Sequence, residues 1–201
     1  IRQPAIVAKQ LSSLAVLSNN RIALGVGLSP WLEDFEACQI PWEKRGQRMD
    51  EMIEIIRGLM KGDYFGYKGQ IFEMEPIKLC PVPTQPVPIL IGGHADAALK
   101  RAARIGDGWI SAGTSIEELD GYLKKLHAFR AEFGRDKEPF EVQNMGASAY
   151  TPDGVKQLED RGVGEVIVAF RDVYKKQPDT TLEEKLATMR WYADNVIAKT
   201  R

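Results

Sequence analysis

Short apolar segments alternate with amphipathic segments along the 201 residues of this chain. The apolar segments lack the strict two-residue alternation of a half-buried strand, which predicts strands buried on both faces. The amphipathic segments carry apolar residues at helical spacing, as at Leu119, Leu123 and Leu126. This order predicts an α/β fold in which helices cover a parallel sheet and each crossover is right-handed.

The pattern predicts five buried strands and six helices. The expected strands are residues 21–27, 87–91, 108–112, 140–150 and 165–170. The expected helices are residues 4–17, 43–61, 95–105, 116–133, 151–161 and a last helix capped by Thr180 or Thr181. Residues 28–41 are expected to form a loop. An open doubly wound sheet and a section of an eight-stranded barrel both satisfy this order.

Residues 62–88 interrupt the alternation of strands and helices. Gly66 and Gly69 lie between β-favouring residues, which predicts a small hairpin outside the main sheet. Prolines at 76, 81, 83, 86 and 88 predict an extended, rigid connection after it. We therefore expect residues 1–201 to form one α/β domain with an insertion at 62–88.

Composition narrows the function classes. The net charge is −1 and Lys and Arg do not cluster, so no nucleic-acid partner is expected. No apolar run approaches the ~18 residues that span a bilayer, so we expect no membrane partner. Cys38 and Cys80 have no ligand or redox spacing, so we expect a reduced, cytoplasmic protein, and the sequence does not exclude a bridge between them. No cluster of His, Cys and carboxylates has metal-ligand spacing, so no metal is expected.

A glycine pair, Gly92 and Gly93, separates the strand 87–91 from the following helix. Glycines let backbone N–H groups approach an anion closely, and a helix N-terminus favours negative charge. The pair predicts a seat for a phosphate-bearing cofactor; the alternative is that the glycines only permit a tight turn. His94 follows them, either as a hydrogen-bond donor to the phosphate or as an exposed residue at the start of the helix.

Four stretches of this sequence resemble the bacterial luciferase-like monooxygenase superfamily, and more closely its branch that uses the deazaflavin coenzyme F420. They are RIALGVG at 21–27, EKRGQRMDE at 43–51, PTQPVPILIGG at 83–93 and AARIGDGW at 102–109. The resemblance implies a TIM (β/α)8 barrel that lacks its first three strands in this chain. The chain begins with Ile1 and not Met, so we expect that a first part has been removed or is absent.

The resemblance implies an oxidoreductase that transfers hydride between reduced coenzyme F420 and a small organic substrate, in a homodimer. An FMN-dependent monooxygenase is the alternative on the same fold. Family likeness assigns the cofactor phosphate to Gly92, Gly93, His94 and Ala95. It assigns the strand end beside the cofactor to Gly25, Val26 and Gly27. No catalytic residue is predicted, because much of the family's catalytic surface lies on the early strands.

Three further expectations concern residues near the predicted site. Trp31 lies beyond the strand 21–27, where it walls a substrate pocket or packs on the next helix. Arg45, Arg48 and Glu51 have helical spacing and are expected to be structural, with Arg48 and Glu51 placed to pair. The rival to an enzyme is a catalytically silent, truncated relative, whose open sheet edges would bind a partner or a second copy.

Overall fold

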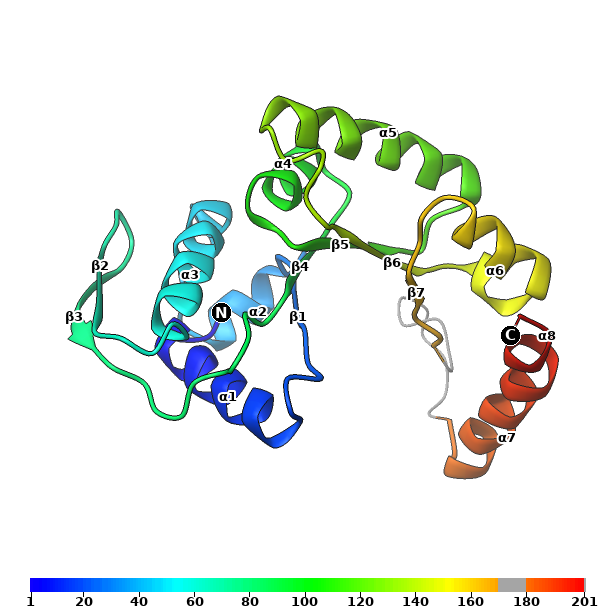
Figure 1. Cartoon of the computed structure of the whole chain (residues 1–201), viewed down its shortest axis with the longest axis horizontal. Coiled ribbons are helices and arrows are strands. Elements are labelled where there is room, and N and C mark those ends of the chain that lie inside the picture. Colours follow the sequence, from blue (N-terminus) through cyan, green and yellow to red (C-terminus); the bar gives the residue numbers. More distant parts are fainter. Residues whose placement is uncertain (170–179, 201) are drawn as a thin grey trace. The chain divides into compact units, whose positions relative to one another are not determined.

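The computed structural model describes residues 1–169 and 180–200 of the chain. The chain divides into two compact units, Ile1–Ile89 (unit 1) and Leu90–Arg201 (unit 2). The five predicted strands correspond to β1 and β4 to β7, and the six predicted helices to α1 and α3 to α7 (Figure 1). The local pattern of the sequence therefore predicts the element order.

In unit 1, α1 (Pro4–Leu17) packs against α3 (Arg45–Leu59). Pro4 occupies the first turn of α1, where its missing N–H costs nothing. The strand β1 (Leu24–Val26) is shorter than predicted, and the N–H of Leu24 donates to the carbonyl of Pro88 (2.8 Å). The apolar sides of the two helices supply much of the core of this unit.

The expected loop at 28–41 contains a short helix, α2 (Leu32–Ala37), which corrects the sequence prediction. Phe35 is buried and meets the ring of Trp42 edge-on, with centroids 5.0 Å apart. Glu33 and Asp34 occupy its first turn, where negative charge favours a helix. A helix too short for a periodic pattern is thus stabilised by one tertiary contact and its N-terminal charges.

The predicted hairpin is present as β2 (Phe65–Lys68) and β3 (Glu73–Ile77), an antiparallel pair in a sheet of its own. Its turn is bound to α3 by the carboxylate of Glu51. The N–H groups of Gln70, Ile71 and Phe72 each donate to that carboxylate at 3.0 Å. Burial alone would raise the pKa of Glu51, but these backbone hydrogen bonds outweigh it and hold the pKa below its ordinary value.

Arg48 and Glu51 bind different partners, so the predicted pairing is not what holds either of them. Arg48 donates to the carbonyls of Pro41 (2.7 Å) and Glu43 (3.2 Å), at the start of α3. Both side chains are buried and bind backbone groups. Their roles are structural, as expected, but they act by holding the segments that flank the helix.

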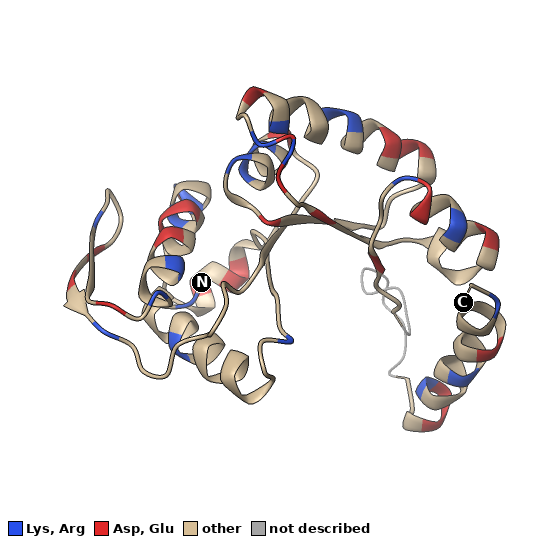
Figure 2. Ribbon diagram, in the orientation of Figure 1, with Lys and Arg blue, Asp and Glu red and all other residues tan. Residues whose placement is uncertain are grey.

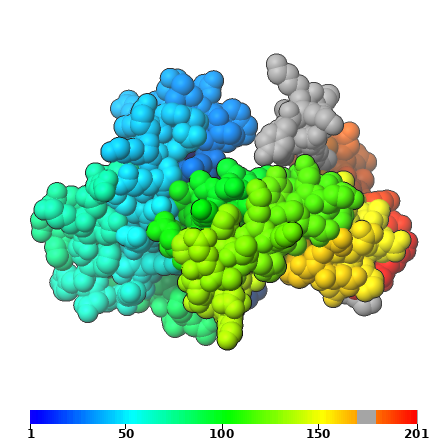
Figure 3. Space-filling model, turned by 90° about the horizontal axis from the view of Figure 1, so that it is seen from above, coloured from blue at the N-terminus to red at the C-terminus, as the bar shows by residue number. Residues whose placement is uncertain are grey.

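Unit 2 repeats the strand–helix pattern. Its strands lie parallel in the order β4-β5-β6-β7, and α4 and α5 cover one face of them (Figure 1). Seen from above, residues of these two helices (green) form the surface there (Figure 3). The elements are β4 (Ile89–Gly92), α4 (Asp96–Ile105), β5 (Gly108–Ala112), α5 (Ile116–Glu132), β6 (Glu141–Met145), α6 (Pro152–Glu159) and β7 (Glu165–Val166). Trp109, Leu99, Leu119 and Leu126 are almost fully buried in the layer between sheet and helices.

Two predicted strands of unit 2 are also shorter in the structure. The strand predicted at 140–150 ends at Met145, and a 3-10 turn (η1, Ala147–Tyr150) follows. The hydroxyl of Tyr150 donates to the carbonyl of Ala169 (2.6 Å) and accepts its N–H (2.9 Å), which holds this turn. The strand predicted at 165–170 is assigned only at Glu165–Val166, and Phe170 lies outside the described residues.

The last helix, α7 (Leu182–Tyr192), begins at Thr181 with a capping box to Glu184. A π turn (η2, Ala193–Ile197) and a short α8 (Ala198–Thr200) follow. The sequence predicts an apolar stripe on this last helix, formed by Leu182, Leu186, Met189, Ala193 and Val196. Of these residues, Val196 is buried, whereas Leu182 and Met189 are 72% and 56% exposed. The periodicity predicts the helix correctly but does not predict which of its residues are covered in this chain.

Candidate functional site

The carboxyl ends of β4, β5 and β6 meet at one edge of the sheet in unit 2. Gly92 lies beside Ile110 in the register, and Ala112 lies beside Met145. The loops that leave these strands, residues 93–95 and 113–115, are called the β4–α4 loop and the β5–α5 loop. Carboxyl ends of parallel strands are where α/β proteins place their ligands. The predicted residues Gly92, Gly93, His94 and Ala95 all lie at this edge.

The β4–α4 loop is shaped by glycine and by one indole. Gly93 has φ +120°, a conformation that disfavours any side chain, and a Cβ there would lie 2.9 Å from the Cβ of Ala98. The indole N–H of Trp109 donates to the Gly93 carbonyl (2.9 Å). The glycine pair is therefore held in one backbone conformation by a buried residue of the neighbouring strand.

The start of α4 carries no side-chain cap. The N-cap residue is Ala95, whose methyl group cannot accept a hydrogen bond from the first turn. The one acidic residue of that turn, Asp96, pairs with Lys125 of α5 (Nζ–Oδ1 2.8 Å). The N–H of Ala98 donates to the Ala95 carbonyl (2.8 Å), so the donors that the helix presents to a ligand are the N–H groups of Asp96 and Ala97, with no Asn, Asp, Ser or Thr cap to accept them.

His94 joins the two loops. Its Nε2 accepts a hydrogen bond from the N–H of Ala112 (3.3 Å), at the end of β5. The ring stacks on Tyr122 of α5 at a centroid distance of 4.8 Å and meets Trp109 edge-on at 6.0 Å. Burial lowers the pKa of His94, against a smaller opposing effect of Glu118. In the neutral ring that accepts at Nε2, the proton is on Nδ1, which leaves Nδ1–H as a donor.

These features fit a phosphate group. An anion would meet the uncapped backbone of α4, a side-chain-free Gly93 and a neutral imidazole donor, without facing an unpaired carboxylate from Asp96. Gly113 of the second loop has φ +72°, and a Cβ there would have nothing within 4 Å. The edge is therefore accessible at Gly113 and rigid at Gly93.

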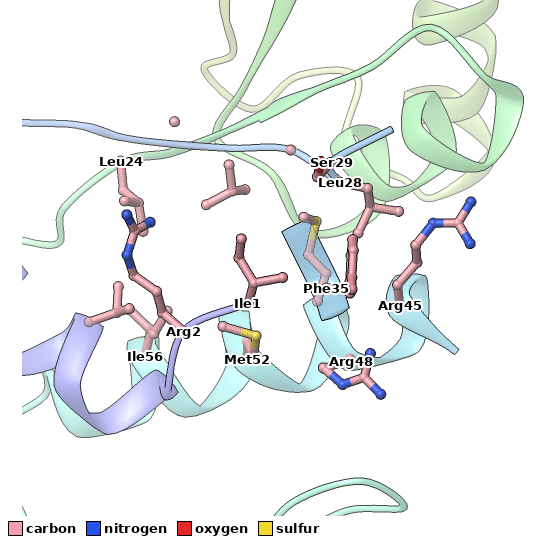
Figure 4. A pocket seen from close by; sticks show the side chains of 15 residues that line it. Ile1, Arg2, Leu24, Leu28, Ser29, Phe35, Arg45, Arg48, Met52 and Ile56 are labelled. Carbon is pink, nitrogen blue, oxygen red and sulfur yellow. The ribbon is translucent and has the colours of Figure 1, made fainter. Parts of the chain in front are cut away.

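A separate pocket of about 270 Å³ lies within unit 1. The predicted residues Gly25, Val26 and Gly27 line it from the end of β1. Met52 and Ile56 rise from α3 on the opposite side (Figure 4). The wall is mainly apolar, as is common for sites that bind the non-polar part of a small molecule.

Arginines border this pocket, and Trp31 does not line it. Arg2, Arg45 and Arg48 are among the lining residues, but Arg48 is already bound to backbone carbonyls. The guanidinium of Arg45 lies 3.8 Å from the ring centre of Trp42. Trp31 is the N-cap residue of α2 and is 53% exposed. The structure therefore places the predicted strand end at a pocket but leaves Trp31 outside it.

The remaining predictions concern metals, cysteines and charge. Among residues 1–169 and 180–200, no group of three or more His, Cys, Asp or Glu side chains is arranged to hold a metal ion. Cys38 and Cys80 are both free and exposed, so no bridge joins them. Basic and acidic residues are interspersed along α5 (Figure 2). Among the helices of this described part, none combines the length with the hydropathy that a membrane span needs.

Several residues of the site escape sequence reasoning. Tyr122 and Trp109 form the surroundings of His94, and a polar cluster of Ser111, Thr114 and Asn144 lies beneath the β5–α5 loop. One sequence feature indicates this polar cluster: Asn144 is a polar residue in the middle of a predicted buried strand. Its partner is 30 residues away, so spacing along the chain does not reveal the pair.

Three relatives show what the sequence is similar to. An uncharacterized protein of Mycobacterium tuberculosis is 52% identical over 200 residues, which cover 99% of this chain and 69% of that protein. A 5,10-methylenetetrahydromethanopterin reductase of Archaeoglobus fulgidus is 30% identical and covers 90% of this chain. An FMNH2-dependent dimethylsulfone monooxygenase of Pseudomonas fluorescens is 29% identical and covers 87%. The chain spans 52% of the reductase and 50% of the monooxygenase.

Two solved structures share the fold. The monooxygenase RslO1 of Streptomyces bottropensis has a TM-score of 0.79 at 19% identity, covering 100% of this chain and 75% of that one. The coenzyme F420-dependent tetrahydromethanopterin reductase of Methanopyrus kandleri has a TM-score of 0.75 at 16% identity, covering 100% and 80%. At these identities the likeness concerns the fold alone.

The chain thus has the α/β-barrel fold of these two solved structures, and it spans part of such a barrel. The family model for luciferase-like monooxygenases matches residues 1–181. The chain belongs to the luciferase-like monooxygenase family. Proteins named for F420 and for FMN are both among the similar proteins, so membership alone does not select the cofactor.

Proposed function

We propose that this chain is an oxidoreductase that binds coenzyme F420 and transfers hydride from its reduced form to a small organic substrate. The observation that carries the proposal is the uncapped start of α4 behind Gly92 and Gly93, with His94 held beside it as an Nδ1–H donor. F420 and FMN both carry a phosphate that this edge would bind. When bound, the deazaflavin supplies the hydride, and the oxidised coenzyme is left after transfer.

The residues of the chain bind and orient. Gly92 and Gly93 bring the backbone close to the phosphate, and Ala95 leaves the first amides of α4 available to it. His94 donates from Nδ1 while Ala112 holds its other ring nitrogen. In unit 1, the apolar pocket at Gly25, Val26 and Gly27 would exclude water from the non-polar part of a small molecule. A homodimer remains the expected assembly.

FMN is the second candidate cofactor, for a monooxygenase. The relative named for FMNH2 aligns with this chain at 29% identity, almost the 30% of the methanopterin reductase. The preference for F420 rests on the likeness of the Gly92–Gly93 segment and the following helix to that branch. Because both cofactors carry a phosphate, the phosphate site serves either choice.

Titration with the two cofactors tests the proposal. The purified chain is titrated with F420 and with FMN, and binding is followed by absorbance and fluorescence. We expect F420 to bind and FMN to bind more weakly. Binding of FMN without F420 would replace the first candidate with the second. A folded chain that binds neither would favour the catalytically silent relative and would overturn the proposal.

Two substitutions at position 94 test the role of the imidazole. In His94→Asn the amide nitrogen approximates Nδ1, whereas in His94→Gln the amide oxygen approximates Nε2 and can still accept from Ala112. Loss of a hydrogen bond to an anion costs about 1.5–3 kcal/mol, or roughly ten- to hundredfold in affinity. We expect His94→Gln to lose this affinity and His94→Asn to retain part of it. His127→Gln, on the exposed face of α5, is the control.

A further inference from the structure

A buried polar cluster lies directly beneath the β5–α5 loop. Ser111 and Asn144 are register partners near the carboxyl ends of β5 and β6, and their relative exposures are 0% and 1%. The hydroxyl of Thr114 lies between them, 2.9 Å from the Ser111 hydroxyl oxygen and 3.1 Å from Nδ2 of Asn144, which donates to it. Two strands and the loop are thus joined through one threonine side chain.

The cluster is costly if its purpose is stability alone. The Oδ1 of Asn144 is buried and has no hydrogen-bond partner. A buried acceptor without a partner costs about 1–3 kcal/mol, and apolar side chains of similar volume would avoid this cost. The hydrogen bonds from Thr114 to Ser111 and Asn144 are what can favour one backbone arrangement over others, because buried polar side chains bonded to one another hold their segments in place.

The arrangement favoured here is that of residues 112–114. Each of the three is bound to a different element: Ala112 to His94, Gly113 to the carbonyl of Met145 (2.5 Å), and Thr114 to the buried cluster. Gly146, which follows β6, packs closely against the backbone of Thr114. A Cβ at position 146 would lie 2.9 Å from the Thr114 carbonyl oxygen. These bonds and this close packing hold residues 112–114 in one backbone conformation beside His94.

We propose that Thr114, held by Ser111 and Asn144, is a positioning residue for the phosphate site. It fixes the backbone of Ala112 and Gly113 against the ring of His94, so that the β5–α5 loop forms the second wall around the anion. This inference rests on the proposed function, since it concerns the same phosphate group. Thr114 acts through the loop and through His94, and its own hydroxyl is engaged below the loop.

The experiment compares cofactors with and without the phosphate. Wild type, Thr114→Val and Thr114→Ser are titrated with FMN and riboflavin, and with F420 and its phosphate-free deazaflavin. Thr114→Val keeps the shape and removes the hydroxyl, whereas Thr114→Ser keeps the hydroxyl. We expect Thr114→Val to weaken the phosphorylated cofactors about tenfold, as for one lost charge-assisted hydrogen bond. Binding of the phosphate-free forms should change less than about twofold, and Thr114→Ser should restore the affinity.

Leu158→Ala is the control for lost stability. Leu158 is buried in α6 of the same unit, so its truncation destabilises unit 2 without removing a bond of the cluster. We expect its cofactor affinities to match those of wild type. If Thr114→Val does not fold, Ser111→Ala removes one of the two bonds to Thr114 and takes its place. Equal weakening of phosphorylated and phosphate-free cofactors, or no weakening, would overturn the positioning role.

A readout without cofactor separates this inference from the proposed function. NMR of the His94 ring reports whether Ala112 still donates to Nε2. We expect the ring of Thr114→Val to lose this hydrogen bond, seen as a change in the Nε2 chemical shift. If the His94 spectrum of Thr114→Val were the same as that of wild type, the inference would be refuted, even if wild type binds F420. Conversely, wild type that binds no phosphorylated cofactor, with His94 disturbed in the variant, would refute the proposed function and limit Thr114 to holding the loop.

Discussion

The ring of His94 lies almost parallel to the ring of Tyr122, with 14° between their planes and 4.8 Å between their centroids. This stack takes one face of the imidazole out of water, and Ala112 donates to its Nε2. Protonation of the ring would place a hydrogen on Nε2 and break that bond. Burial and this hydrogen bond both favour the neutral ring, in agreement with the lowered pKa of His94.

The first prediction follows from the direction of that pKa shift. Since the pKa is lower in the folded chain, the stabilising effect is complete above the ordinary histidine pKa, about 6.5. As the pH falls below this value, the unfolded chain takes up the proton first and the effect is lost. The free energy of unfolding, measured by urea denaturation from pH 8 to 5, should fall more in wild type than in His94→Gln. His127→Gln should follow wild type, and parallel profiles for wild type and His94→Gln would contradict the prediction.

The second prediction concerns the carboxylate that binds the hairpin turn. Glu51→Gln replaces an acceptor by an NH2 group that faces backbone N–H donors from Gln70, Ile71 and Phe72. We expect the free energy of unfolding to fall by about 2 kcal/mol. Because the pKa of Glu51 is lowered in the fold, wild type should also lose stability as the pH drops below the ordinary glutamate value, whereas Glu51→Gln should lose less.

Glu73→Gln is the matched control in the same hairpin. Glu73 pairs with Lys68 at 3.4 Å, but both side chains are exposed. An exposed pair of this kind contributes about 0.2–1 kcal/mol, so its loss should have a small effect. Hydrogen exchange at residues 70–72 gives a local measurement. If Glu51→Gln left the exchange of these amides unchanged, the carboxylate would not be what holds the turn.

The third prediction compares two glycines of unit 2. Gly93→Ala places a side chain at φ +120° and against Ala98, so we expect a loss of about 1–3 kcal/mol in unfolding free energy and weaker cofactor binding. Gly121 lies within α5 with open space around its Cβ position. Gly121→Ala should stabilise the chain by about 0.5–1 kcal/mol. Thermal and urea unfolding check both, and a Gly93→Ala chain as stable as wild type would refute the strained geometry.

The fourth prediction concerns the C-terminal helices. Val196 is 1% exposed, so Val196→Ala should lower the free energy of unfolding by about 1–2 kcal/mol. Leu182 is 72% exposed, and Leu182→Ser should stay within about 0.5 kcal/mol of wild type. Urea denaturation of the two variants measures the contrast. A large loss on Leu182→Ser would show that this side of α7 is covered in solution.

The helices and strands are predictable from the sequence because their causes are local. Apolar residues at helical spacing and the capping pairs Ser115–Glu118 and Thr181–Glu184 lie within a few positions of one another. The sequence does not predict the helix α2, because six residues are too few for a periodic pattern. In addition, its buried residue Phe35 packs on Trp42, which lies outside the helix. The end of β6 was misplaced because Tyr150, which holds the turn after it, bonds to Ala169.

The sequence by itself determined the order of strands and helices, the hairpin, and the glycine pair before α4, since each depends on neighbours along the chain. Only the tertiary structure decided what surrounds these features: Ala112 and Tyr122 on His94, Trp109 on Gly93, and Asn144 under Thr114. It also decided that much of the apolar stripe of α7 is exposed. The physical reason is that hydrogen bonds and burial depend on distance in space, and parallel strands bring together residues that lie 16 to 30 positions apart.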